Sequence, residues 1–244
     1  MDTGYYRTVI FDIETVARPF EQLDPSLQNK VIDRAVARAN EESMESDVIL
    51  EEEKNLLALN SLYAEVVAIG VLDAETDRGA VYYVAPGQEG KEIEEDGIKF
   101  SALSEEDALR RFWEVARACR KLVGFNSRTF DGPFLSIRSA VNGLRPSVDL
   151  MANRYLKLQP APQHIDLLDQ LTFYGATWPR RGSLHEWCLA FGIPSPKTSD
   201  VSGSEVGRMF TSGQYLDIAR YNVLDLQATR ELYRRWDEFL NFQK

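Results

Sequence analysis

The stretch RTVIFDIET (residues 7–15) decides the fold, because its side chains alternate in type along the chain. Successive side chains of a β-strand point to opposite faces of the sheet, so this alternation predicts a strand. One predicted face is apolar and holds Val9, Phe11 and Ile13. The other face carries Asp12 and Glu14, roughly 6.6 Å apart along the backbone. Carboxylate oxygens suit hard divalent cations, although an Asp-x-Glu pair alone also fits an exposed strand end.

After this strand the sequence predicts a helical insert and then a return to the sheet. Residues 20–60 are rich in Glu, Ala and Leu and contain no glycine, which indicates one or two acidic helices inserted at approximately residues 17–62. The apolar runs 66–72 and 79–85 flank a turn-like segment and predict a β-hairpin beside the first strand. Residues 87–97 are polar and are expected to form a loop.

Helices and strands alternate in the remainder of the chain. Ser104 and the acids after it predict a helix over residues 104–119, followed by a short buried strand at 121–126. A helix is expected at 130–141, and the longest one at 214–242. Short helices are expected in HIDLLDQLTFYG (164–175), SLHEWCLAFG (183–192) and GSEVGRMF (203–210). This order predicts one mixed α/β domain over residues 1–244.

Composition excludes several classes of protein. The chain of 244 residues is 44% hydrophobic and contains no apolar stretch long enough to cross a membrane. Its N-terminus lacks the pattern of a signal peptide. Cys119 and Cys188 lie far apart with no second cysteine near either, and His185 beside Cys188 provides too few ligands for a zinc site, so the sequence indicates neither a disulfide framework nor bound zinc. We therefore expect a cytoplasmic protein with no membrane partner.

The charge of −10 is unevenly distributed. Residues 1–110 hold 10 Lys and Arg against 25 Asp and Glu, whereas residues 111–244 hold 18 against 13. A basic surface favours nucleic acid, so the acidic total argues against that partner. The second segment, with its net positive charge, remains able to meet a phosphate backbone, although charge runs are more often solvated faces.

Two more acids complete a candidate metal set. Asp131 begins a predicted helix at the carboxyl end of a buried strand, where α/β sheets place ligands, although an acid there also caps a helix. Tyr221 and Asp225 lie four residues apart on the last helix and so share one side of it. Each feature alone fits a structural role. Two metal ions stabilise the attacking and leaving oxygens in phosphodiester cleavage, and four acids in this order suit such a pair.

These residues resemble a known family. FDIET (11–15), GFNSRTFDGPFL (124–135) and YNVLD (221–225) look like the three motifs of the DEDD exonuclease superfamily, in its tyrosine variant. More narrowly, SLHEWCLAFGIPSPK (183–197) and IARYNVLDLQAT (218–229) are similar to predicted exonucleases related to the proofreading domain of family-B DNA polymerases. The resemblance implies an RNase H-like fold with a mixed five-stranded sheet flanked by helices.

The resemblance also implies roles for individual residues. Asp12, Glu14, Asp131 and Asp225 would hold two Mg²⁺ or Mn²⁺ ions, and Tyr221 would orient the attacking water. By matching position, the resemblance assigns substrate contacts to Thr15, Asn126 and Phe130. Arg128 is a candidate contact to the scissile phosphate only by its place between Asn126 and Asp131. The implied reaction is 3′-to-5′ hydrolysis at single-stranded or frayed 3′ ends, DNA favoured over RNA, with release of 5′-mononucleotides.

Two other functions remain open: a non-catalytic nucleic-acid or protein-binding module on the same fold, and a metal-dependent endonuclease. The acidic insert offers a surface for a protein partner, and the sequence leaves the oligomeric state open. His164 and Asp166 invite a metal site, but a lone histidine beside an apolar run is more often structural. Arg180 and Arg181 beside Trp178 suggest a phosphate and base contact.

Overall fold

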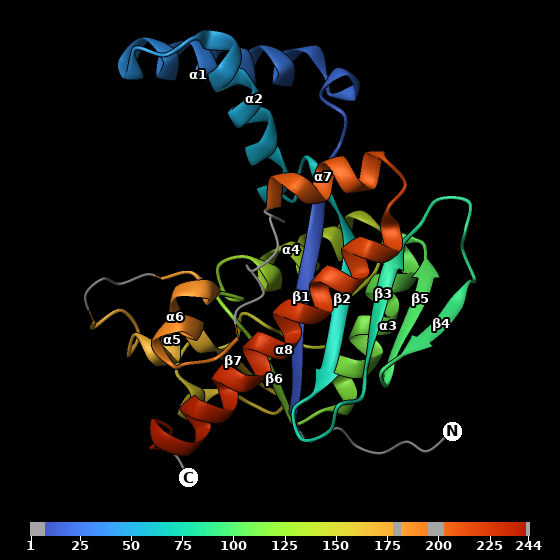
Figure 1. Cartoon of the computed structure of the whole chain (residues 1–244), viewed down its shortest axis with the longest axis vertical. Coiled ribbons are helices and arrows are strands. Elements are labelled where there is room, and N and C mark those ends of the chain that lie inside the picture. Colours follow the sequence, from blue (N-terminus) through green and yellow to red (C-terminus); the bar gives the residue numbers. More distant parts are fainter. Residues whose placement is uncertain (1–7, 178–181, 195–202, 243–244) are drawn as a thin grey trace.

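The computed structural model describes residues 8–177, 182–194 and 203–242. A seven-stranded mixed sheet lies at its centre, in the order β4-β5-β3-β2-β1-β6-β7 (Figure 1). The strands are β1 (Thr8–Ala17), β2 (Ala64–Asp73), β3 (Gly79–Val84), β4 (Glu92–Glu95), β5 (Ile98–Leu103), β6 (Lys121–Gly124) and β7 (Gln163–Asp166). The expected mixed α/β fold is confirmed.

Strand β1 lies in the interior of the sheet and pairs with a strand on each side. β2 runs antiparallel to it and β6 runs parallel to it. As predicted, the odd-numbered residues Val9, Phe11 and Ile13 enter one core cluster, whereas Ile10 enters the other. Asp12 and Glu14 therefore share the face of Ile10. The register of β1 against β2 shifts between Glu14 and Thr15, just after this acidic pair.

Helices cover both faces of the sheet (Figure 1). On the face of Phe11, the core includes residues of α3 (Glu105–Ala118) and α4 (Asp131–Val141). On the face of Ile10 lies the 25-residue α8 (Tyr215–Phe239), which contacts β1, β2 and β3. Three shorter helices belong to that second side: α5 (Leu167–Leu171), α6 (Leu184–Ala190) and α7 (Gly203–Thr211). The face that carries the two acids is therefore covered by the C-terminal helices.

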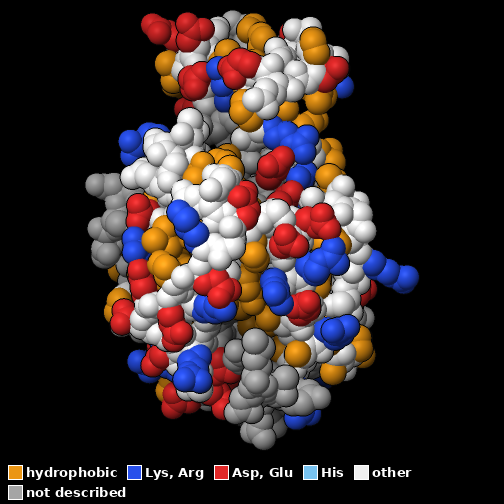
Figure 2. Space-filling model, turned by 90° about the vertical axis from the view of Figure 1, so that its right-hand side faces the viewer, with side chains coloured by type: hydrophobic (Ala, Val, Ile, Leu, Met, Phe, Trp, Pro, Cys, Tyr) orange, Lys and Arg blue, Asp and Glu red, His pale blue; other side chains and the backbone are white. Residues whose placement is uncertain are grey.

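The helical insert after β1 projects from one end of the sheet (Figures 1 and 2). It consists of α1 (Pro25–Glu42) and α2 (Ser46–Leu56), flanked by the short 3₁₀ turns Phe20–Gln22 and Leu57–Leu59. Asp24 caps α1 by accepting from the backbone N–H of Ser26. The two helices bury small side chains such as Ala35 and Ala39 against Ile49. The expected acidic helices are confirmed.

The sheet has seven strands where the resemblance implied five, and β4, β5 and β7 were not predicted from the sequence. The polar stretch 87–97 contains β4, an edge strand whose glutamates are largely exposed. Edge strands commonly carry charge, so β4 lacks the apolar alternation that predicts a strand. The segment at 164–175 was expected to be a helix. Its first residues belong to β7, and its helical part is Leu167–Leu171. Within the described residues, no helix is long and apolar enough to cross a membrane.

Candidate metal centre

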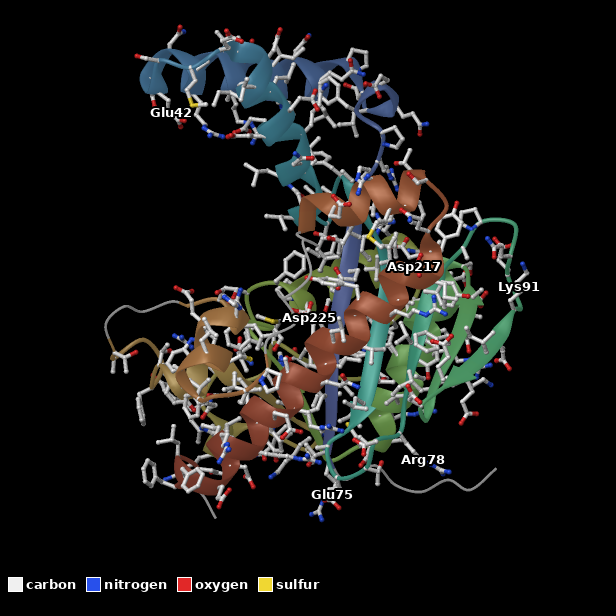
Figure 3. All side chains as sticks on the ribbon, in the orientation of Figure 1. Glu42, Glu75, Arg78, Lys91, Asp217 and Asp225 are labelled. Carbon is white, nitrogen blue, oxygen red and sulfur yellow. The ribbon has the colours of Figure 1, made fainter. Side chains whose placement is uncertain are left out.

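Three carboxylates converge where α8 crosses β1. One oxygen from each of Asp12, Glu14 and Asp225 lies within 4.8 Å of the others. The two β1 acids face α8 because they share one face of the strand, and Asp225 lies midway along that helix, as Figure 3 shows. Residues from both ends of the sequence thereby form one acidic cluster.

Asp131 lies beside this cluster at the start of α4 and is only 3% exposed. Its Oδ1 accepts a hydrogen bond of 3.2 Å from the backbone N–H of Ile13, between the two acids of β1. Burial is the main cause that raises the pKa of Asp12 well above its usual range, and repulsion from Asp131 is the next. The fourth predicted acid is therefore close enough to interact with the first.

The electrostatics of the cluster favour a bound cation. Burial raises the pKa of Glu14, and repulsion from Asp225 raises it further. Burial likewise raises the pKa of Asp131 to about 7. Several buried carboxylates that repel one another are costly to ionise unless positive charge joins them. An all-oxygen donor set of this kind fits hard divalent ions such as Mg²⁺ or Mn²⁺.

Tyr221 lies one turn before Asp225 on α8, half-buried. Burial is the first cause that raises the pKa of its phenol, followed by repulsion from Asp225, Glu14 and Asp12, and a hydrogen bond with Asp225 adds to the effect. The phenol therefore stays protonated at neutral pH and can donate a hydrogen bond beside the carboxylates.

Asn126 and Phe130, two of the four predicted substrate contacts, lie on the loop between β6 and α4. The backbone of Asn126 is left-handed, with φ of 58°, a conformation that asparagine tolerates. The half-buried ring of Phe130 packs against Phe134, with ring centroids 5.3 Å apart. Both residues therefore lie within five positions of Asp131.

The other two predicted contacts are engaged within the protein. The guanidinium of Arg128 donates to three backbone carbonyls, those of Leu150, Met151 and Ala152, at 3.2, 3.2 and 2.7 Å. The hydroxyl of Thr15 donates to the carbonyl of Ala58 at 2.7 Å, which joins β1 to the foot of the insert. These four bonds give the two side chains a structural role.

His164 has a structural role, which is the role that the sequence favoured for it. Burial, the first cause, lowers the pKa of its imidazole to about 4, so the ring is neutral. Its Nδ1 lies 2.7 Å from the carbonyl oxygen of Leu150, which can only accept, so Nδ1 carries the proton. Nε2 then accepts from the hydroxyl of Ser127 at 2.8 Å. Trp178, Arg180 and Arg181 lie outside the described residues.

Asp166 has a role that sequence reasoning missed. Its buried carboxylate accepts backbone N–H groups of Asn126 and Arg128 at 3.0 and 2.9 Å, and it also caps α5 through Leu168 and Asp169. It thereby holds the loop that leads into Asp131. An Asp before an apolar helical run is a cap signal, but its contact with a loop 38–40 residues away leaves no local pattern.

Replacing Asp166 with Ala should therefore cost about 2–4 kcal/mol of stability, because buried backbone donors lose a charged acceptor. The midpoint of urea unfolding measures this loss. Asp33 is exposed on α1, so Asp33→Ala provides a matched control that should change stability by less than about 0.5 kcal/mol. Equal midpoints for the two variants would contradict the role assigned to Asp166.

Comparison with known proteins identifies a family whose model covers most of this chain. The model of a family described as predicted 3′-5′ exonucleases related to the exonuclease domain of PolB matches residues 59–241. That range includes Asp131, Tyr221 and Asp225 but begins after β1 and after both helices of the insert. No match was found among curated proteins.

Among solved structures, the family B DNA polymerase from the hyperthermophilic archaeon Pyrobaculum calidifontis matches with a TM-score of 0.58 and 17% identity, over 96% of this chain and 25% of that chain. This chain thus spans a quarter of the length of the polymerase. At this identity the likeness shows the fold alone, and it supports the expected RNase H-like architecture.

Proposed function

Because this chain belongs to the family of predicted 3′-5′ exonucleases related to the exonuclease domain of PolB, we propose that it removes nucleotides one at a time from 3′ ends. The substrate we propose is single-stranded or frayed nucleic acid, DNA in preference to RNA, and the products are 5′-mononucleotides. The convergence of Asp12, Glu14 and Asp225 carries this proposal, since three carboxylates within 4.8 Å form a site for cations.

Two divalent ions, Mg²⁺ or Mn²⁺, are the proposed cofactors. Asp12, Glu14 and Asp225 would hold one ion, and Asp131 would contribute to the second, with Asp12 shared between them. Bound there, the ions would stabilise negative charge on the attacking and leaving oxygens of the phosphodiester. The protein's own contribution is to hold four carboxyl groups close together in a partly buried site, where bound cations would favour their ionised form.

Tyr221 would orient the attacking water by donating a hydrogen bond. Its phenol remains protonated because burial and the neighbouring carboxylates raise its pKa, so it is a poor base. Asn126 and Phe130 lie on the loop beside Asp131 and are the proposed contacts to the terminal nucleotides. Thr15 and Arg128 are the weaker proposed contacts, because each side chain already donates to backbone carbonyls of this chain.

Replacing Tyr221 with Phe should lower the cleavage rate about 10- to 100-fold, the range expected for one lost hydrogen bond in a charged setting. The pH profile of the variant should run parallel to that of the wild type, because the phenol does not titrate between pH 6 and 9. Initial rates across that range test both points. A profile that changes shape in the variant would instead indicate that the phenol gives up its proton.

The insert is the proposed contact for a protein partner, within what we propose is a single domain. It leaves apolar side chains exposed, including Ile32 and Val36 on α1 at 38% and 44% and Val48 on α2 at 46%. Figure 2 shows these helices standing clear of the rest of the molecule. A surface of that kind is accessible without covering the acidic cluster.

A circular single-stranded DNA separates an exonuclease from the other functions. With Mn²⁺, we expect the protein to release mononucleotides from a linear strand and to leave a circle of the same sequence intact. Cleavage of the circle would indicate an endonuclease. Binding of the linear strand with no cleavage at all would indicate a binding module.

A further inference from the structure

Asn222 contacts the acidic cluster but is not one of its four acids. Its side chain is fully buried on α8, one residue after Tyr221. Its Nδ2 donates a hydrogen bond of 2.8 Å to Oδ2 of Asp12. One oxygen of that carboxylate is therefore held by an uncharged donor, which fixes the direction of the other.

Gly70 on β2 gives Asn222 the space that it occupies. Gly70 is the register partner of Asp12 in the antiparallel pair. A Cβ atom at Gly70 would lie 1.9 Å from Oδ1 of Asn222 and 2.5 Å from Cδ1 of Leu226, closer than any side chain allows. The backbone of Gly70 has no positive φ, so space and not conformation requires glycine here.

The other end of the amide shows that Asn222 is not there to satisfy the core. Its Oδ1 is buried and has no hydrogen-bond partner among the described residues. A buried carbonyl left without a donor reduces stability, and an apolar side chain of similar shape would avoid that loss. The useful end of Asn222 is therefore its Nδ2, which faces the carboxylates.

We propose that Asn222, seated in the gap left by Gly70, is a positioning residue that orients the Asp12 carboxylate for divalent cations. This inference rests on the proposed function. In it Asn222 acts through Asp12 and does not itself touch the reacting atoms. Groups that orient metal ligands affect metal affinity or activity about 10- to 100-fold when they are removed.

The variant Asn222→Leu tests the inference because leucine keeps the approximate shape and lacks the donor. We expect the Mn²⁺ concentration for half-saturation, measured by titration calorimetry without nucleic acid, to rise about 10- to 100-fold. The melting temperature of the metal-free variant should stay near that of the wild type, because loss of the unpartnered carbonyl offsets loss of the hydrogen bond to Asp12. If Asn222 had a merely structural role, the variant would melt at a lower temperature and would bind Mn²⁺ as tightly as the wild type.

A second variant reaches the same contact from β2. Gly70→Ala should displace the amide and weaken Mn²⁺ binding to a similar extent, and adding Asn222→Leu to it should weaken binding little further. Gly207 on α7 has open space where a Cβ would lie, so Gly207→Ala is the matched control and should bind Mn²⁺ as the wild type does. This pair decides the matter if Asn222→Leu alone unfolds.

The outcomes separate this inference from the proposed function. Unchanged Mn²⁺ affinity in Asn222→Leu and Gly70→Ala would overturn the positioning role, even if the wild type degrades a strand. Weakened affinity in both variants would support it, even if the wild type cleaves nothing. A wild type that binds no Mn²⁺ would also overturn it, since no ion would need an oriented ligand.

Discussion

Replacing Asp12 with Asn should reduce the rate of nucleotide release by at least about 10³-fold, the effect of losing several kcal/mol of charge stabilisation in the reaction. Asp12 is the carboxylate at the centre of the cluster, where Asp131, Asp225 and Glu14 all act on its pKa. Asparagine keeps the shape and an acceptor for Asn222 but removes the charge that attracts cations. The initial rate on a single-stranded DNA with saturating Mn²⁺ measures the effect.

The loss should not come from unfolding. Removing one of several buried like charges relieves repulsion, so metal-free Asp12→Asn should melt at or above the temperature of the wild type. Asp33→Asn on the exposed face of α1 is the matched control and should retain full activity. A rate for Asp12→Asn within a few-fold of the control would place the chemistry away from this cluster.

Mn²⁺ should raise the melting temperature of the wild type by about 5–10 °C at one hundred times its dissociation constant. A ligand at that excess stabilises the folded state by about 2.7 kcal/mol, and each kcal/mol shifts the transition by about 2–4 °C for a chain of roughly this size. Asp12→Asn should lose most of the shift. An equal shift in both proteins would indicate that Mn²⁺ binds elsewhere.

The same cluster sets a pH dependence for the metal-free protein. Burial raises the pKa of Asp131 to about 7 from an ordinary value of 3.8, so the folded state holds its proton more tightly than the unfolded state does. The stability from this group is complete below about pH 4 and is lost as the pH rises through about 7. The Mn²⁺ shift should grow over the same range, because cations compete with protons for the carboxylates.

Asp131→Asn tests that assignment, since it removes the titrating group and leaves the N-terminus of α4 in place. The variant should lose less stability than the wild type between pH 4 and 7 in the absence of metal. Melting curves in a chelator across this range provide the comparison. Parallel curves would show that other groups cause the dependence.

The sequence was sufficient to predict the local features of the site. The alternation in β1 correctly placed Asp12 and Glu14 on one face, and the spacing of Tyr221 and Asp225 correctly placed them on one side of α8. These periodicities are properties of single elements, so they can be read from a few residues. The resemblance added what no single element shows, namely that β1, α4 and α8 bring their acids to one place.

Contacts between distant segments were beyond the reach of such patterns. Arg128 could be assigned to a phosphate because nothing local shows that carbonyls 22–24 residues later surround its guanidinium. The contribution of Gly70 depends on its pairing with Asp12 and on a helix about 150 residues later in the chain, so in the sequence it resembles any other strand glycine. Such features follow from packing, which periodicity does not encode.

The most direct test of the central claim is degradation of a 5′-labelled single-stranded DNA and its RNA counterpart, with Mn²⁺ or Mg²⁺ and with a chelator. The account predicts a ladder that shortens from the 3′ end with metal, stronger for DNA, and lost in Asp12→Ala and in the chelator. Shortening that persists in Asp12→Ala, or no cleavage by the wild type under any of these conditions, would contradict it.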